Sequence, residues 1–319
     1  MKILDSNFKT MQLRRRKSIL WDLQMLIWTP AVFFCISFSS FAMCAETENP
    51  KAVWQEVLTA VKAIKNPTCG KGSALVSFTG RMGDPEIRLA IVDFEFKDDL
   101  SRSEMFLTTD NGEKGKRGTV WVQGKEYAIV YNPFMVALEP KPIRQFYRKV
   151  GYDFHADTFS RLSNHPVSFL LERRANGPGT FSAERVGNSI LNLVGRYEDP
   201  NQRVYHLLSF DISEEYRLIF AKDNIEFLND HKKDINETHT IEWAKYGSEW
   251  YIKSAKLECV YWDKDINAPT TGTIEVVIRN FDPNAIIDTN DFKLEGLGIP
   301  KGTLIRDQIS NRQYKYGSQ

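Results

Sequence analysis

The chain has 319 residues, with 42 Lys and Arg against 41 Asp and Glu. Residues 1–45 hold six of these basic and two of these acidic residues, so the remainder carries a net charge of −3. Nucleic-acid-binding proteins present a basic face, and this balance argues against nucleic acid as a partner.

The N-terminus has the layout of an export signal. Residues 14–17, RRRK, precede an apolar stretch at 23–42, and small residues follow. This order is typical of a secretory signal and predicts cleavage within 42–45 and a mature chain of 46–319. The apolar stretch is also long enough to span a bilayer, so an uncleaved signal anchor stays an alternative, as does lipidation of Cys44. We expect a periplasmic or secreted protein, peripheral to a membrane at most unless it keeps that anchor.

Two cysteines remain in the mature chain, Cys69 and Cys259. In an oxidising compartment they could form a disulfide, which would close a long loop and be worth about 5 kcal/mol in the chain-entropy model. Two buried thiols that act as small hydrophobes are the alternative.

Residues 49–65 predict an amphipathic helix. Asn49 suits the cap, and Pro50 suits the first turn, where its missing N–H costs nothing. Apolar residues then recur at helical spacing and form one stripe: Trp54, Val57, Leu58, Val61 and Ile64. Strand-like runs bounded by Gly, Asp or Asn follow at 73–80, 87–96 and 102–109.

The stretch GTVWVQGKEYAIVYNPF, residues 118–134, predicts a β-hairpin. Gly124-Lys125 suits a two-residue loop in which Gly takes the positive φ of a type II′ turn. That register places Val122 opposite Tyr127, Trp121 opposite Ala128 and Val120 opposite Ile129. Both faces are apolar, so we expect both sides of this hairpin to be covered.

Residues 153–175 interrupt the strand pattern with one or two short helices. Strands return from Phe181 onward, at 190–198, 203–212, 216–223, 238–262 and 271–281. No linker divides the chain, so we expect one β-rich domain over 46–319.

A second two-residue turn is predicted at Gly247-Ser248. It would pair Trp243 with Ile252 and Glu242 with Lys253. Each such cross-strand pair should stabilise the sheet by roughly 0.2–1 kcal/mol.

No catalytic or metal-binding motif is present in the sequence. The five histidines lack the His-Glu-x-x-His spacing of a zinc site: His155, His165, His206, His231 and His239. No Gly-x-Ser-x-Gly elbow presents a nucleophile. We therefore expect a non-enzymatic protein with no cofactor and no metal.

Three segments resemble the LolA-type periplasmic carriers of outer-membrane lipoproteins: VQGKEYAIVYNPF (122–134), HPVSFLLE (165–172) and FKLEGLGIPKGTLIRD (292–307). In that family a strand, a Gly-Lys turn, an aromatic strand and Asn-Pro-Phe follow one another. The last segment resembles the family's closing stretch, and a similar tail occurs in secreted proteins of planctomycete-like bacteria. The resemblance implies a mainly β fold, a curved and incomplete antiparallel β-barrel. An N-terminal amphipathic helix and short helices would lie over its concave side.

The resemblance also implies a function. The family's concavity holds the acyl chains of a lipoprotein or lipid, so we expect a carrier that binds such cargo in its curved sheet. The predicted lining is the larger apolar wall of the hairpin with two residues of the short helix: Val120, Val122, Tyr127, Ile129, Tyr131, Phe169 and Leu170. Arg81 and Arg88 are both candidates for the family's functional arginine. The alternative is an envelope sensor or protein-interaction domain on the same fold, with an envelope protein as partner and no lipid transport.

Overall fold

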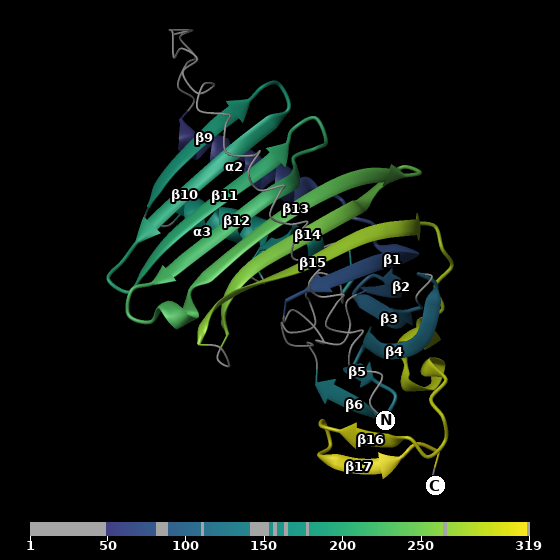
Figure 1. Cartoon of the computed structure of the whole chain (residues 1–319). Coiled ribbons are helices and arrows are strands. Elements are labelled where there is room, and N and C mark those ends of the chain that lie inside the picture. The colour runs from purple at the N-terminus through teal and green to yellow at the C-terminus, as the bar shows by residue number, and fades with distance from the viewer. Residues whose placement is uncertain are drawn as a thin grey trace, which may run out of the picture. The chain divides into compact units, whose positions relative to one another are not determined.

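The computed structural model describes residues 49–80, 89–109, 112–140, 153–155, 158–162, 165–176, 179–263 and 267–317. The expected signal segment, Cys44, Arg81 and Arg88 lie outside these residues. The described residues form a 15-stranded sheet in the order β17-β16-β6-β5-β4-β3-β2-β1-β15-β14-β13-β12-β11-β10-β9 (Figure 1). Neighbouring strands pair antiparallel except β16 and β6, which are parallel.

The sheet has three groups of strands. The first comprises β1 (Cys69–Thr79), β2 (Leu89–Lys97), β3 (Leu100–Thr108), β4 (Lys114–Gln123), β5 (Tyr127–Tyr131) and β6 (Met135–Pro140). The second comprises β9 (Thr180–Val186), β10 (Ile190–Glu198), β11 (Gln202–Asp211), β12 (Arg217–Phe227), β13 (Ile235–Tyr246), β14 (Glu249–Asp263) and β15 (Ala268–Asp282). The C-terminal pair is β16 (Leu304–Asp307) and β17 (Arg312–Lys315).

Short elements accompany the sheet. The α-helices are α2 (Pro50–Ala63) and α3 (Val167–Asn176), and a separate two-stranded sheet joins β7 (Arg161–Leu162) to β8 (His165–Pro166). The 3-10 helices are η1 (Thr158–Ser160), η2 (His231–Lys233), η3 (Thr289–Phe292) and η4 (Leu294–Leu297). None of the described helices combines the length and the hydropathy that crossing a membrane requires. All described residues belong to one compact unit, Glu48–Gln319.

Helix α2 forms as its sequence predicts. The Asn49 side chain accepts a hydrogen bond from the Lys51 backbone N–H at 3.1 Å and caps the first turn. The apolar stripe faces the sheet, where the Trp54 ring meets Phe181 of β9 edge-on at 5.0 Å between centroids. Helix α3 packs against α2, and an exposed Lys62–Glu172 ion pair of 3.2 Å joins the two helices.

The sheet curves toward the face that carries α2 and α3, which we call the inner face. Strands β2 and β14 are three strand spacings apart, about 14 Å in a flat sheet. The rings of Phe94 on β2 and Tyr251 on β14 nevertheless lie 6.0 Å apart between centroids. Gly72 on β1 leaves room for this approach, because a Cβ there would lie 2.7 Å from the Phe94 ring. The expected curved, incomplete antiparallel barrel is therefore confirmed.

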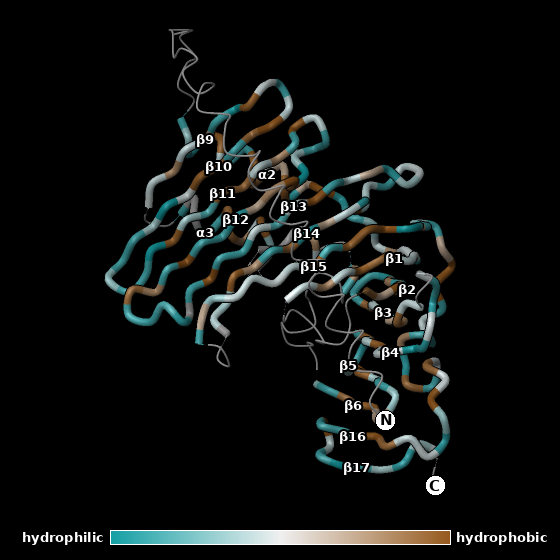
Figure 2. The backbone as a smooth tube through the Cα atoms, viewed as in Figure 1, coloured by the Kyte–Doolittle hydropathy of each residue, from teal (hydrophilic) through white to brown (hydrophobic). Residues whose placement is uncertain are grey.

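Apolar and polar residues alternate along the strands (Figure 2), and the buried ones gather in two cores. The inner core joins α2 and α3 to the inner faces of β1, β2 and β10–β15. The outer core lies on the opposite face, between β4–β6 and the segment that follows β15, which we call the tail. The β4–β5 hairpin has Val120, Val122 and Ile129 in the outer core, and Trp121 packs against the inner core from the other face, so the expectation that both its sides are covered is confirmed.

The two predicted hairpin turns have different outcomes. Gly247 adopts φ 66°, and Trp243 lies opposite Ile252 as expected. A β-bulge shifts Glu242 opposite Ser254, yet its carboxylate still lies 3.3 Å from Lys253 Nζ.

The turn at Gly124 was predicted wrongly. Val122 lies opposite Ile129 rather than Tyr127, because the turn lies one residue further along the chain. The Gly124 N–H donates to the Tyr127 carbonyl at 3.1 Å, which leaves Lys125 and Glu126 as the loop, and Gly124 has no positive φ. A shift of two leaves every side chain on its expected face.

Of the two alternatives for Cys69 and Cys259, the structure contradicts the disulfide. Cys259 lies opposite Gly272 on β15, whereas Cys69 lies near Lys71, whose partner on β15 is Asp282. Ten positions of β15 separate those partners, about 33 Å along the strand. A disulfide needs Cα atoms within about 4.4–6.8 Å of each other. The Cys69 thiol instead donates to the Pro283 carbonyl at 3.1 Å.

Candidate functional site

The seven residues predicted to line a cavity do not lie together. Val120, Val122 and Ile129 are fully buried in the outer core, with Tyr127 and Tyr131 packed against it. The tail covers them with Ile287, Phe292, Leu294, Leu297 and Ile299. Leu170 belongs to the inner core, and Phe169 on the same helix is 43% exposed. The apolar wall of the hairpin is thus occupied by the protein's own tail.

Polar contacts fasten the tail to this wall. The Arg117 guanidinium donates to the Leu297 carbonyl through two nitrogens, each at 3.3 Å. A Cβ on Gly124 would lie 2.9 Å from the Phe292 carbonyl, so this position needs glycine for the close approach of the tail. Burial raises the pKa of the Tyr127 phenol and Glu295 adds to that rise, while a hydrogen bond with the Leu294 backbone opposes it.

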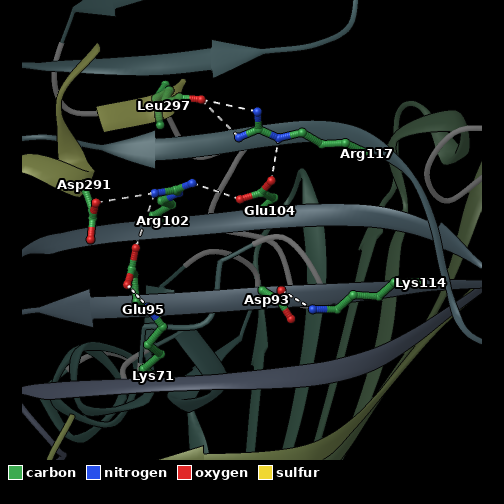
Figure 3. Close-up of polar contacts among 9 residues, drawn as sticks. All are labelled: Lys71, Asp93, Glu95, Arg102, Glu104, Lys114, Arg117, Asp291 and Leu297. Carbon is green, nitrogen blue, oxygen red and sulfur yellow. Dashed lines mark hydrogen bonds and ion pairs between the residues drawn. The ribbon is translucent and has the colours of Figure 1, made fainter. Parts of the chain in front are cut away.

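An ion-pair network extends from the contact between Arg117 and the tail over the outer face of β1–β4 (Figure 3). Arg102 Nη2 lies 2.9 Å from Glu104, and its Nη1 lies 3.6 Å from Glu95 and 3.9 Å from Asp291 of the tail. Glu104 also contacts Arg117 at 2.5 Å, and Glu95 contacts Lys71 at 2.9 Å. The network borders a groove of about 850 Å³. These charges neutralise one another, so we assign the network a structural role in holding the tail.

The inner face carries a different set of polar groups. His206, Asp223, Glu237 and Cys259 lie directly opposite one another on β11, β12, β13 and β14. Each has the strand phase of inner-core residues, which are Leu208, Ala221, Ile241 and Leu257. They therefore form one row across the inner face, which we call the ionisable row. At its β10 end lies Gly195, where a Cβ would be 3.2 Å from the Trp54 ring.

Short distances connect the members of the row. His206 Nδ1 lies 2.8 Å from Asp223 Oδ1, and both side chains are buried. His239, two residues beyond Glu237 on the same face of β13, has its Nε2 3.6 Å from Glu237 Oε2. Within the part of the chain that the structure describes, no three His, Cys, Asp or Glu side chains gather closely enough to hold a metal ion.

An apolar row runs beside the ionisable row, two residues further along each strand. It has one residue from each of β10–β14: Tyr197, Val204, Ile225, Ile235 and Tyr261. Val204 is buried, and the other four are only half-buried. Four strand spacings make the row about 19 Å long. This end of the inner face thus offers an apolar strip bordered by hydrogen-bonding groups, which is the usual make-up of a ligand site.

Sequence reasoning missed the ionisable row, although its signal is visible. His206 alternates with Val204 and Leu208, and Asp223 alternates with Ala221 and Ile225. An ionisable residue in the apolar phase of a strand is expected to face the core, where it needs a partner or a function. Which of these residues meet depends on strand registers, and no local motif encodes them.

Comparisons with known proteins find likeness in structure alone. No protein-family model and no curated protein sequence matches the chain. A DUF1329 family protein from Desulfovibrio piger is 10% identical, with 78% of this chain and 99% of that chain covered at a TM-score of 0.44. MucB, in its complex with MucA(peri), is 8% identical, with 74% of this chain and 100% of that chain covered at a TM-score of 0.17. At these TM-scores neither likeness bears on function.

Proposed function

We propose that the protein is an exported, non-enzymatic carrier that binds an acyl chain along the apolar row at the end of the inner face. The half-buried side chains of Tyr197, Ile225, Ile235 and Tyr261 carry this proposal. Removing apolar surface from water contributes about 25 cal/mol per Å², and the row is as long as a long acyl chain.

The apolar row suits this role better than the hairpin wall does. The wall is buried beneath the tail, and a ligand there would first have to displace Phe292 and its neighbours. The apolar row needs no such displacement of the described tail. The ligand class implied by the family resemblance is kept, and its place in the fold changes.

Uptake of an uncharged fluorescent alkyl probe tests the proposal. We expect saturable binding by the wild type and at least a tenfold loss in Ile235→Asp, because the new carboxylate must be desolvated when the chain binds. The control is Val260→Asp on the outer face of β14, where a half-buried valine lies opposite Asn236 and Thr271. It should bind the probe like the wild type. No uptake by a folded wild type, or equal loss in both variants, would contradict the proposal.

Export is a separate part of the proposal. We expect the mature chain to begin between Glu46 and Pro50, after removal of the basic and apolar segments. N-terminal sequencing of periplasmic material measures this directly. A mature protein that retains RRRK would instead favour the membrane-anchored form.

A further inference from the structure

The Glu237–His239 pair on β13 stands out within the inner face. The two side chains point to the same side, with Glu237 Oε2 and His239 Nε2 3.6 Å apart. His239 is 7% exposed, and its Nε2 has no hydrogen bond among the described residues. A buried ring nitrogen without a hydrogen bond costs free energy, which a bound donor would recover.

The charge at this place is negative. Asp223 lies directly opposite Glu237, and like charges at opposite positions of a ladder repel. Asp223 is 1% exposed and has the His206 imidazole at 2.8 Å, whereas the Glu237 side chain is 27% exposed. The Glu237 carboxylate is therefore the one that an incoming group can reach.

We infer that the ligand of the proposed carrier bears an ammonium head group, which donates to Glu237 Oε2 and to His239 Nε2. This inference rests on the proposed function. An ammonium has three donors, and two acceptors 3.6 Å apart can both lie within hydrogen-bonding distance of one nitrogen. Ile235 and Tyr261 of the apolar row lie next to Glu237, on the side away from His239. The alkyl chain therefore continues from the head group along that row.

The alternatives to an ammonium fit less well. A carboxylate head group would meet the Glu237 carboxylate as a like charge and could only accept hydrogen bonds. A hydroxyl group could donate one hydrogen bond and would leave the repulsion between Asp223 and Glu237 unchanged. A cation relieves that repulsion, so the site selects against the fatty acid and for the amine of the same chain.

Three probes with the same labelled alkyl chain, ending in an amine, an alcohol or a carboxylate, test the inference by fluorescence titration at neutral pH. We expect the amine to bind roughly tenfold tighter than the alcohol, and the carboxylate to bind weakest. Glu237→Gln should remove most of the amine's advantage over the alcohol. The control Glu242→Gln lies on the same strand at an exposed position and should keep the wild-type order.

Other outcomes separate the inference from the proposed function. Equal binding of amine and alcohol by the wild type would overturn the ammonium site and leave the carrier function standing. No binding of any probe would overturn both. His239→Phe keeps a flat ring in the core and removes the acceptor, so it should lower amine affinity even if Glu237→Gln does not fold. Equal loss of amine and alcohol affinity in His239→Phe would count against the inference.

Discussion

The outer core and the β10–β14 end of the inner face both carry apolar side chains, but the described residues cover them to different extents. On the outer face, the tail lies on β4–β6, and Arg102 and Arg117 hold it there. On the inner face of β10–β14, four of the five residues of the apolar row stay half-buried beside the ionisable row. The two regions share a sheet and differ in how far the described residues cover their apolar side chains.

This difference shows why an apolar strand face does not by itself mark a ligand site. Val120, Val122 and Ile129 form as apolar a wall as any in the molecule, and their neighbours bury it completely. Close packing of that kind contributes to stability and leaves no room for cargo. A site needs apolar surface that the fold leaves accessible, together with polar groups that orient the ligand.

The largest predicted effect is the loss of a tail anchor. Phe292 is buried in the outer core, and Phe292→Ala should lower the free energy of unfolding by about 3–5 kcal/mol through the cavity it leaves. Denaturant unfolding measures this loss. Probe uptake by the folded fraction should be unchanged, and a variant that gained or lost binding would show that the outer core takes part in it.

The next effect concerns the aromatic end of the inner core. Gly70→Ala places a Cβ 2.2 Å from the Phe281 ring and 3.1 Å from the Phe96 ring, so the rings must move. Overpacking of this kind should destabilise the fold by about 3 kcal/mol. Ser77→Ala, on the outer face of the same strand, should cost far less. The proposed ligand site lies at the other end of the face, so equal probe affinity is expected; a change would mean that the two ends are coupled.

Removing the Arg102 guanidinium should have an intermediate effect on the free energy of unfolding. Its guanidinium contacts three carboxylates, of which Glu95 is 7% exposed at the side chain. Arg102→Met leaves Glu95 and Glu104 without that partner and should cost about 2 kcal/mol. The exposed Lys253–Glu242 pair offers a matched control, and Lys253→Met should cost under about 0.5 kcal/mol. Equal losses measured by chemical denaturation would show that the network does not hold the tail.

Particular elements show how far the sequence predicts this molecule. The Gly247 hairpin was predicted correctly because one positive-φ glycine between two strands sets a register locally. At Gly124 the same reasoning failed, since that glycine is required by the Phe292 carbonyl more than 160 positions away. The ionisable row joins four strands whose registers no local pattern encodes. The parallel pairing of β16 with β6 likewise joins two segments that lie far apart in the sequence.

The smallest predicted effect comes from a change at Tyr127, on the face of the β4–β5 hairpin that the tail covers. Tyr127→Phe keeps the ring in the outer core and removes the hydrogen bond with the Leu294 backbone, so it should cost about 1 kcal/mol at neutral pH. Burial raises the pKa of this phenol, so its contribution to stability is complete below the unfolded value of about 10 and is lost as the pH rises through the folded value. The difference between wild type and Tyr127→Phe should therefore shrink in denaturant unfolding above about pH 10. Probe uptake should be the same in both proteins. If Tyr127→Phe keeps full stability but loses the alkyl probe, the hairpin wall binds the cargo and the apolar row does not.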